Sequence, residues 1–288
     1  MNAYNNIVYN IGFVKGRVKV RATYKFILIC LVFVVGACVN APYTTTRISS
    51  HLEVITDDCD ETTLVVYDVD ETLVQPSDSF LSNEHTVQGR NFLSELVKKY
   101  PKKTDWGRFR AILLRDASMP MIEVGVLNVI KKFREKGAKV IALTSMNTGK
   151  IGFYQRLEAW RYEQLKSLGF EGDFPWEHFP LRGFKRNPVF YRGVLAADLE
   201  NKGEVLAAFL KKVQLHPRKI IAIDDDIKAL NQVGDLCKRQ GMSFQGYLYS
   251  GAKQVLWKQK VIDAQAEHLI NNGVWIDDQK IQGLFKTN

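Results

Sequence analysis

Three acidic side chains follow directly after an apolar segment in the stretch LVVYDVDETLVQ, residues 64–75. Asp68, Asp70 and Glu71 lie within four positions, and carboxylates this close repel one another unless a cation or hydrogen-bond donors compensate them. The apolar run predicts a buried strand, and a two-residue offset returns Asp70 to the face of Asp68 while the backbone stays extended. Asp68 and Asp70 therefore lie on one face at the end of the predicted strand, and we assign Glu71 no catalytic role.

Polar side chains also follow two later apolar segments, AKVIALTS at 138–145 and KIIAIDDD at 219–226. A hydroxyl at the end of a strand, together with the N–H groups of the next helix, can bind an anion. Adjacent carboxylates are ligands that Mg²⁺ favours. The candidate residues in these two segments are Thr144, Ser145, Asp224, Asp225 and Asp226. A divalent cation among these acids would also compensate Asp68.

Strands and helices alternate around these motifs. Continuous apolar runs predict strands over residues 63–68, 138–145, 219–226 and 244–250. Amphipathic spacing predicts helices over residues 124–137, 154–169, 202–213, 227–240 and about 257–271. Apolar strands that are each followed by a helix imply an α/β fold, a Rossmann-like three-layer parallel sheet. Ligands bind outside the carboxyl ends of such strands, so we expect the polar motifs on one rim.

Two segments interrupt this alternation. Residues 76–117 carry the helical stretches GRNFLSELVKKY and DWGRFRAILLRDA, and we interpret them as a small, mainly helical cap insertion over the rim. Residues 171–200 predict a loop and a short hairpin, with a turn at Arg192 and Gly193. The expected division is therefore a core of residues 62–75 and 118–285 and a cap of residues 76–117.

The polar motifs follow one another in a recognisable order: DVDET (68–72), ALTS (142–145), the lysine of NKGEVL at 202, and IAIDDD (221–226). This order resembles the four motifs of the haloacid dehalogenase-like (HAD) superfamily over about residues 62–250. The surrounding sequence is also similar to an uncharacterised group of bacterial envelope members. The resemblance implies a HAD-like core in which Asp68 is the nucleophile that forms an aspartyl phosphate, and Asp70 is the general acid and base. Because dehalogenases lack an aspartate at the position of Asp70, the resemblance favours a phosphatase or phosphotransferase.

The resemblance also implies which residues bind the phosphate. Thr144 would bind the phosphoryl group through its hydroxyl, and Ser145 competes for that role. Lys202 would neutralise the phosphate and the nucleophile and stabilise charge in the transition state. Lys185 or Arg186 could supply this cation instead.

The implied cofactor is Mg²⁺. Its ligands would be the carboxylate of Asp68, a backbone carbonyl from Asp70, and the carboxylate of Asp225, with Asp224 as a second candidate. Phosphate and water oxygens would complete an octahedron, which is the coordination that Mg²⁺ requires. The choice among the three consecutive acids at 224–226 stays open at this point.

The N-terminus has the composition of a secretory signal. Residues 1–25 hold five basic and no acidic residues, and the apolar run FILICLVFVVGAC follows. VGAC resembles a lipoprotein lipobox, so we predict a signal peptide over residues 1–37, lipidation of Cys38, and a polar tether over residues 38–61. The alternatives are an ordinary signal peptide or an uncleaved anchor. The prediction places the protein in the bacterial cell envelope, on the periplasmic side and anchored to the membrane by lipid.

Charge and cysteine usage limit the remaining classes of function. The formal net charge of +9 falls to +4 without residues 1–37, and no basic stripe interleaved with aromatic residues is present, so no nucleic-acid partner is expected. Of the cysteines beyond the lipobox, Cys59 and Cys237 could form a disulfide or remain two separate thiols.

These features together predict Mg²⁺-dependent hydrolysis of small-molecule phosphomonoesters outside the cytoplasm. One alternative is a phosphotransferase that uses the same site with another acceptor. A second alternative is a non-catalytic envelope lipoprotein that keeps the HAD fold and only binds a ligand.

Overall fold

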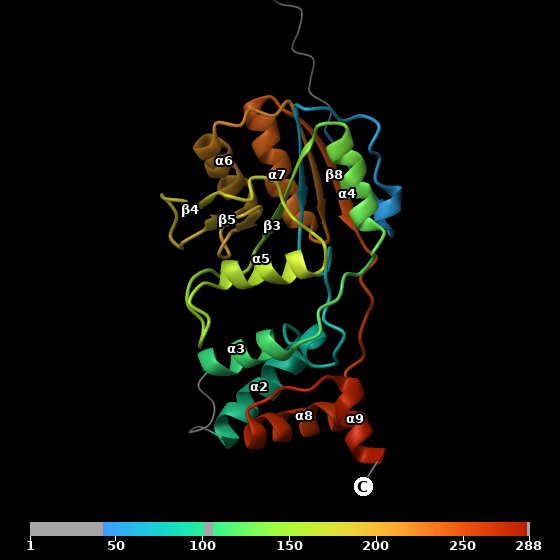
Figure 1. Cartoon of the computed structure of the whole chain (residues 1–288), viewed down its shortest axis with the longest axis vertical. Helices are drawn as coiled ribbons and strands as arrows, with labels where there is room; N and C mark the ends of the chain where they lie inside the picture. Colours follow the sequence, from blue (N-terminus) through green and yellow to red (C-terminus); the bar gives the residue numbers. More distant parts are fainter. Residues whose placement is uncertain (1–42, 101–105, 287–288) are drawn as a thin grey trace, which may run out of the picture. The chain divides into compact units, whose positions relative to one another are not determined.

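An eight-stranded sheet forms the centre of the computed structural model, which describes residues 43–100 and 106–286 (Figure 1). Its spatial order is β1-β8-β7-β2-β3-β6-β5-β4. Each neighbouring pair from β1 to β6 in this order is parallel, whereas β5 pairs antiparallel with β6 and with β4. The strands are β1 (Tyr43–Ile48), β2 (Thr63–Tyr67), β3 (Lys139–Thr144), β4 (His178–Pro180), β5 (Val189–Tyr191), β6 (Val194–Ala196), β7 (Lys219–Asp224) and β8 (Ser243–Tyr249).

Helices connect and cover these strands. Two short 3₁₀ helices are η1 (His51–Glu53) and η2 (Leu81–Asn83). The α-helices of the described residues are α2 (Val87–Lys99), α3 (Trp106–Asp116), α4 (Val126–Glu135), α5 (Leu157–Ser167), α6 (Lys202–Val213), α7 (Ile227–Gln240), α8 (Gln259–Asn272) and α9 (Asp278–Lys286).

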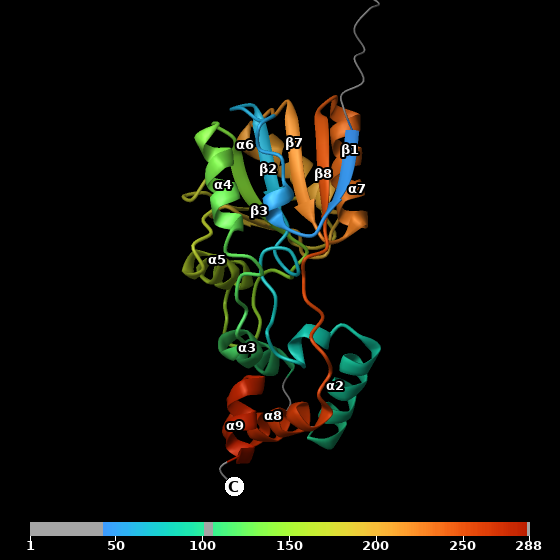
Figure 2. The ribbon, with the colours of Figure 1, turned by 90° about the vertical axis from the view of Figure 1, so that its right-hand side faces the viewer.

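Side chains alternate between two buried faces along the central strands, which lie side by side in Figure 2. On β2, Val65 and Tyr67 belong to a cluster with apolar residues of α4 and α5. Leu64 and Val66, from the same strand, belong to a second cluster with residues of α6 and α7. Burying each such side chain contributes about 1.5–3 kcal/mol, so both faces hold the sheet in place. The predicted three-layer α/β fold is therefore confirmed.

The predicted hairpin is also present. β5 and β6 pair antiparallel, and the two residues between them, Arg192 and Gly193, have φ angles of 49° and 88°. Both angles are positive, as in the type I′ turns that join two-residue hairpins. A glycine is required there because its Cα lies close to the backbone of Gly172, where a Cβ would lie 2.5 Å from the Gly172 Cα.

The predicted tether is wrong for most of its length. Residues 43–48 form the edge strand β1, which pairs with β8 along its whole length. His51, in η1, is fully buried and stacks on Tyr249 at 4.2 Å between ring centroids. The polar composition misled the prediction because only Ile48 of this strand is buried. The segment is part of the domain and not a flexible connection to it.

The predicted cap is incomplete. Figure 1 shows α8 and α9, which we expected in the core, beside α2 and α3. Ile262 and Leu269 of α8 share an apolar cluster with Leu96 of α2 and Phe109 of α3. Trp275, which follows α8, contacts Phe80 with ring centroids 5.4 Å apart. We therefore define the cap module as residues 76–117 together with residues 257–286.

Cys59 and Cys237 are both free thiols, so the disulfide alternative is wrong. Within residues 43–100 and 106–286, no helix has the length and apolar character that a membrane span needs. The predicted signal peptide over residues 1–37 and the lipidation of Cys38 lie outside the described residues.

Candidate active site

The parallel pairing of β2 with β7 brings two acidic motifs to one rim of the sheet. Tyr67 pairs with Ile223, and the Asp68 amide donates to the Ile223 carbonyl at 2.8 Å. Asp68 therefore follows β2 at the level where Asp224 ends β7. Both side chains are buried, with 7% and 8% of their surface exposed. The sequence places them there because each follows a continuous apolar run that must lie inside the sheet.

A buried lysine joins these two carboxylates. The Lys202 Nζ lies 2.6 Å from Asp68 Oδ1 and 2.7 Å from Asp224 Oδ2. Lys202 is the first residue of α6, which Asn201 caps through its side chain, and the Lys202 amide donates to the Gln232 side chain at 2.9 Å. Its side chain is only 5% exposed. The cation predicted at 202 thus contacts the predicted nucleophile.

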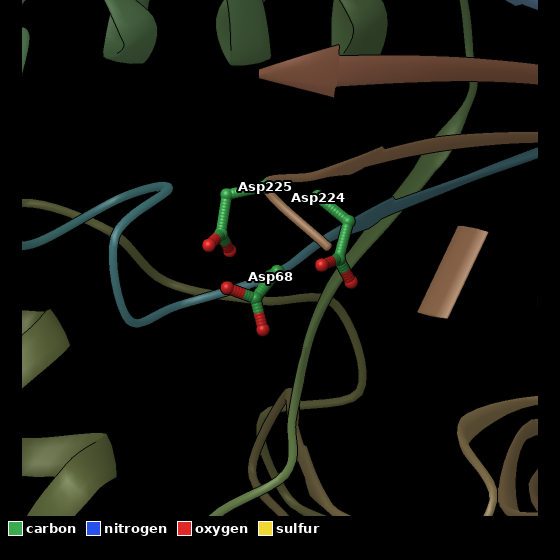
Figure 3. Close-up of side chains that lie close together, drawn as sticks. All are labelled: Asp68, Asp224 and Asp225. Carbon is green, nitrogen blue, oxygen red and sulfur yellow. The ribbon is translucent and has the colours of Figure 1, made fainter. Parts of the chain in front are cut away.

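Three carboxylates converge beside this lysine. One carboxylate oxygen from each of Asp68, Asp224 and Asp225 lies within 4.8 Å of the other two. Figure 3 shows the three side chains close together. Thr72 fixes the third member, because its Oγ1 accepts from the Asp225 amide at 3.1 Å and donates to Asp225 Oδ1 at 3.3 Å. Asp226 lies outside the cluster and caps α7, accepting from the Lys228 amide at 2.8 Å. The structure therefore brings Asp224 and Asp225, but not Asp226, to Asp68.

The protonation of the cluster is strongly perturbed. Burial raises the pKa of Asp68 to about 7, with Asp224 and Asp70 adding to the rise and Lys202 opposing it. Burial likewise raises the pKa of Asp225 to about 7 and raises the pKa of Asp224. Burial alone would lower the pKa of Lys202, but the two carboxylates more than offset that, so its pKa lies above the ordinary value. One lysine thus faces two buried acids and a partly buried third, and its single positive charge cannot compensate all three.

Asp70 lies apart from the three-carboxylate cluster. Its side chain is 44% exposed and pairs with Arg161, whose Nη2 lies 2.8 Å from Asp70 Oδ1. The Thr144 hydroxyl lies 3.4 Å from Asp70 Oδ2. The Asp70 carboxylate is therefore not part of the three-carboxylate cluster. That its backbone carbonyl would bind a metal stays a prediction.

The two candidate phosphate-binding hydroxyls have different surroundings. Thr144 is buried at the end of β3, where its Oγ1 also accepts from the Met146 amide at 3.2 Å. Ser145 is exposed and lines a cavity of about 560 Å³. Lys185 and Arg186 are both exposed, whereas Lys202 contacts Asp68, so the lysine at 202 is the better candidate for the phosphate cation.

The cavity lies next to the site, and residues of the core and of the cap module line it. Asp70, Ser145 and Arg161 come from the core, and Arg110 and Leu113 come from α3. Its volume is within the range of about 300–1,000 Å³ that is usual for small-molecule sites. A ligand in this cavity would contact Asp70 directly.

Sequence reasoning missed Arg161. Its side chain is 5% exposed, its Nη1 donates to Gln164 at 2.7 Å, and its guanidinium lies 4.9 Å from the Trp160 ring. Its Nε is buried without a hydrogen-bond partner among the residues that the structure describes. Charged residues of an amphipathic helix normally face solvent, and no motif spacing marks this one. The packing of α5 against β5 and β6 brings Arg161 to Asp70 at the rim of the sheet.

Two supporting features of the DVDET loop were also missed. Glu71 has a φ of 62°, a conformation that non-glycine residues seldom adopt, and its amide donates to the Val74 carbonyl at 2.9 Å. The His51 Nε2 lies 2.9 Å from the Thr72 carbonyl. Residues before β2 thus support the loop that holds Asp225, and no pattern in the polar segment around His51 indicated this.

Comparisons with known proteins give a family without an assigned activity. A family model described as "Protein of unknown function (DUF2608)" matches residues 44–282. An uncharacterised protein of Rickettsia prowazekii is 23% identical over 259 residues, which cover 87% of this chain and 93% of the relative. A Chlamydia trachomatis protein named "Putative outer membrane protein" is 23% identical over 228 residues, covering 72% of this chain and 81% of the relative. No solved structure gives a significant match.

Proposed function

The chain belongs to the family described as "Protein of unknown function (DUF2608)", and we propose that it is a Mg²⁺-dependent phosphatase that hydrolyses phosphomonoesters. The observation that carries the proposal is the contact of one buried lysine, Lys202, with Asp68 and Asp224 beside a third carboxylate, Asp225. The resemblance of the four motifs to the HAD superfamily supports the same activity. In this proposal Asp68 is the nucleophile and Asp70 the general acid and base.

The donor set fits a magnesium ion. Three carboxylates face one lysine, so full ionisation leaves an excess of negative charge that a divalent cation would neutralise. Oxygen donors are those that Mg²⁺ prefers over nitrogen or sulfur. Asp68, Asp224 and Asp225 would hold the ion, and it would supply charge neutralisation for the phosphate. Burial raises the pKa of Asp68 and of Asp225 to about 7 although Lys202 opposes the rise, so these two acids would gain from a further cation.

The residues of the chain would divide the reaction into two steps. A carboxylate oxygen of Asp68 attacks phosphorus, the bond to the alcohol oxygen breaks, and Asp70 donates a proton to the departing oxygen. Water then attacks phosphorus of the aspartyl phosphate and gives a proton to Asp70. The bond between phosphorus and the Asp68 oxygen breaks, the Asp68 carboxylate is restored, and orthophosphate leaves. Lys202 and Thr144 would stabilise the negative charge on the phosphoryl oxygens in both steps.

We also propose that the protein works in the bacterial cell envelope. Two chlamydial relatives carry the name "Putative outer membrane protein", and the second, from Chlamydia muridarum, is 22% identical over 271 residues that cover 97% of it. The lipobox-like VGAC at residues 35–38 supports attachment to the membrane through Cys38. Metabolic labelling with a fatty acid tests this part, because Cys38→Ser would abolish the label if the anchor forms.

Hydrolysis of p-nitrophenyl phosphate tests the activity. The purified protein should release nitrophenol with Mg²⁺ and not with EDTA, and Asp68→Asn should abolish the release. Asp226→Asn is the matched control, because it changes a neighbouring acid outside the cluster and asparagine caps a helix as well as aspartate does. Product that appears on an added alcohol instead of as free phosphate would indicate a phosphotransferase. A folded protein that binds Mg²⁺ but turns over no phosphomonoester would indicate a binding protein.

A further inference from the structure

The cavity beside Asp70 is mostly apolar, although it adjoins a cluster of acids. More than half of its lining residues are apolar, and they come from both the core and the cap module. The large ones include Trp106, Leu113 and Leu114 of α3 and Leu157 and Trp160 of α5. Phosphate alone would need none of these contacts. The apolar lining therefore indicates which kind of group the phosphate of a substrate is attached to.

Two of the apolar lining residues are exposed in the absence of a ligand. Trp106 is 48% exposed and Leu199 is 57% exposed. Leu199 has a φ of 64°, and the preceding Asp198 has a φ of 50°, so this loop keeps a strained backbone. The Leu199 amide donates to the Ser145 carbonyl at 3.0 Å, which fixes the loop beside the rim. A rigid loop thus presents an apolar side chain at the site, where a ligand would cover it.

The arginines that line the cavity already have partners. Arg110 forms an ion pair with Glu84, and Arg161 forms one with Asp70. The guanidinium of Arg90 donates to the His85 carbonyl. Two of these three arginines thus face a carboxylate of the protein, whereas Arg90 donates only to a backbone carbonyl. A second anionic group on a substrate would compete with Glu84 or Asp70 at Arg110 and Arg161, whereas an apolar group would only displace water.

We propose that the site takes a phosphomonoester of an apolar alcohol, with an alkyl or aromatic group in this cavity and the phosphate at Asp68 and Lys202. This inference rests on the proposed phosphatase activity and specifies its substrate class. Apolar burial contributes about 0.8 kcal/mol per methylene. That corresponds to a rise of about fourfold in kcat/KM for each methylene that enters the cavity.

A series of straight-chain alkyl phosphates tests this substrate class. Ethyl, butyl and hexyl phosphate have leaving groups of nearly the same basicity, so differences in kcat/KM report burial and not chemistry. Glycerol 3-phosphate is the polar comparison of similar size. We expect kcat/KM to rise from ethyl to hexyl phosphate, and glycerol 3-phosphate to be a poorer substrate than butyl phosphate.

Leu199→Asn tests whether the rise comes from this cavity. Asparagine tolerates the left-handed conformation at this position, so the loop keeps its shape while the apolar side chain is lost. The ratio of kcat/KM for hexyl over ethyl phosphate should fall by about threefold or more. Leu256→Asn is the matched control, because Leu256 is 68% exposed and is not among the residues that line this cavity. It should leave the ratio unchanged.

The outcomes separate this inference from the proposed activity. If ethyl phosphate and glycerol 3-phosphate were hydrolysed as fast as hexyl phosphate, the proposed apolar substrate class would be wrong. The proposed phosphatase activity would still stand. The substrate class would also be wrong if kcat/KM rose with the length of the alkyl chain but Leu199→Asn and Leu256→Asn changed that rise equally. Another surface of the protein would then bind the alkyl chain. Failure to hydrolyse every ester, including p-nitrophenyl phosphate, would overturn the phosphatase itself.

Discussion

The Arg161 Nη2 lies 2.8 Å from Oδ1 and 3.1 Å from Oδ2 of Asp70, so one guanidinium nitrogen contacts both carboxylate oxygens. Arg161 is the buried member of the pair, with 5% of its side chain exposed against 44% for Asp70. A buried arginine held by Gln164 and Trp160 has little freedom, so it fixes the direction of the more exposed carboxylate. Arg161 is a positioning residue in this arrangement, and Asp70 is the group that would act on substrate.

Arg161→Lys should therefore impair proton transfer selectively. A lysine ammonium is a point charge on a flexible stem and cannot contact Asp70 while it also keeps the contacts of the guanidinium with Gln164 and Trp160. General acid catalysis contributes about 10²–10⁴-fold, and we expect the variant to lose at least about tenfold in kcat/KM with an alkyl phosphate, whose leaving group needs a proton. The loss of kcat/KM should be much smaller with p-nitrophenyl phosphate, whose leaving group needs none. We compare kcat/KM because it does not include the later hydrolysis step, in which Asp70 would act as a base for both substrates.

The comparison of two leaving groups separates positioning from a general structural effect. Asp70→Asn should show the same selectivity as Arg161→Lys, because both act on one proton. Arg156→Lys, at an exposed residue before the same helix, is the control and should change neither rate. Equal losses for both substrates in Arg161→Lys would contradict the role of Arg161.

Lys202→Met should make the stability of the protein depend on Mg²⁺. Removing one partner of a buried ion pair costs about 3–5 kcal/mol, because Asp68 and Asp224 would be left without their cation. Mg²⁺ should restore part of this loss, since binding to the folded state alone raises the free energy of unfolding. Chemical unfolding with EDTA and with Mg²⁺ measures both effects.

Lys211→Met is the control for this prediction. Lys211 lies on the same helix but is exposed, so its replacement should change the free energy of unfolding by less than about 0.5 kcal/mol. A Lys202→Met protein that is as stable as the wild type in EDTA would show that the three acids need no cation. A loss that Mg²⁺ does not reduce would argue against a metal site at Asp68, Asp224 and Asp225.

The central fold was predictable because its strands are buried on both faces. Runs such as that ending at Asp224 are continuous and apolar, and the helices between them have clear amphipathic spacing. The edge strand β1 gave no such signal, since five of its six residues are exposed. The partner of α8 could not be read from the sequence either, because an amphipathic helix does not reveal which apolar surface it covers. Phe80 and Trp275 are far apart in the chain but in contact in the cap module.

The candidate site, like the fold, was predictable only in part. Asp68, Lys202, Asp224 and Asp225 each lie at the end of a predicted strand or the start of a predicted helix, and they meet as expected at one rim. Residues that act on these through a second contact, such as Arg161, were not predictable. Their positions depend on helix orientation and loop packing, for which a single sequence carries no periodic signal.

His51 should make stability depend on pH. Burial lowers its pKa below the ordinary 6.5, although the Thr72 carbonyl and Glu123 oppose the shift. Its Nε2 contacts the Thr72 carbonyl, and its Nδ1 is buried without a partner among the described residues, so a second proton would find no acceptor. The unfolded chain therefore binds this proton more readily than the folded one. The contribution of His51 should be present well above pH 6.5 and be lost as the pH decreases, by up to about 1.4 kcal/mol per pH unit. Asp68 and Asp225 act in the opposite direction, because their raised pKa values favour the folded state as the pH falls through about 7.

Unfolding midpoints at pH 7.5 and 5.5 check the contribution of His51. His51→Gln keeps a donor for the Thr72 carbonyl but has no proton to gain. The midpoint at pH 5.5 should therefore rise relative to the midpoint at pH 7.5, compared with the same two midpoints of the wild type. His216→Gln, at an exposed histidine, should leave the difference as in the wild type. A pH dependence that persists unchanged in His51→Gln would assign it to other groups.

Asp278 should hold the two parts of the cap module together. Its Oδ1 accepts from the Ser79 amide at 3.0 Å, its Oδ2 accepts from Lys258 at 3.0 Å, and the Ser79 hydroxyl also donates to it. Asp278→Asn replaces one acceptor oxygen with an NH₂ group that faces donors. Because hydrogen bonds to a buried charge are worth about 1.5–3 kcal/mol each, the module should lose about 2–3 kcal/mol of local stability.

Amide hydrogen exchange can detect this loss, since it reports local opening segment by segment. Exchange should accelerate together in residues 79–99 and 259–272, which lie far apart in the sequence, while β2 and β7 keep wild-type protection. Asp277→Asn is the matched control, because Asp277 caps the start of α9 by accepting from the Lys280 amide and does not contact Ser79. Acceleration confined to α9, or spread into the central strands, would mean that residues 257–286 do not form one cooperative unit with residues 76–117.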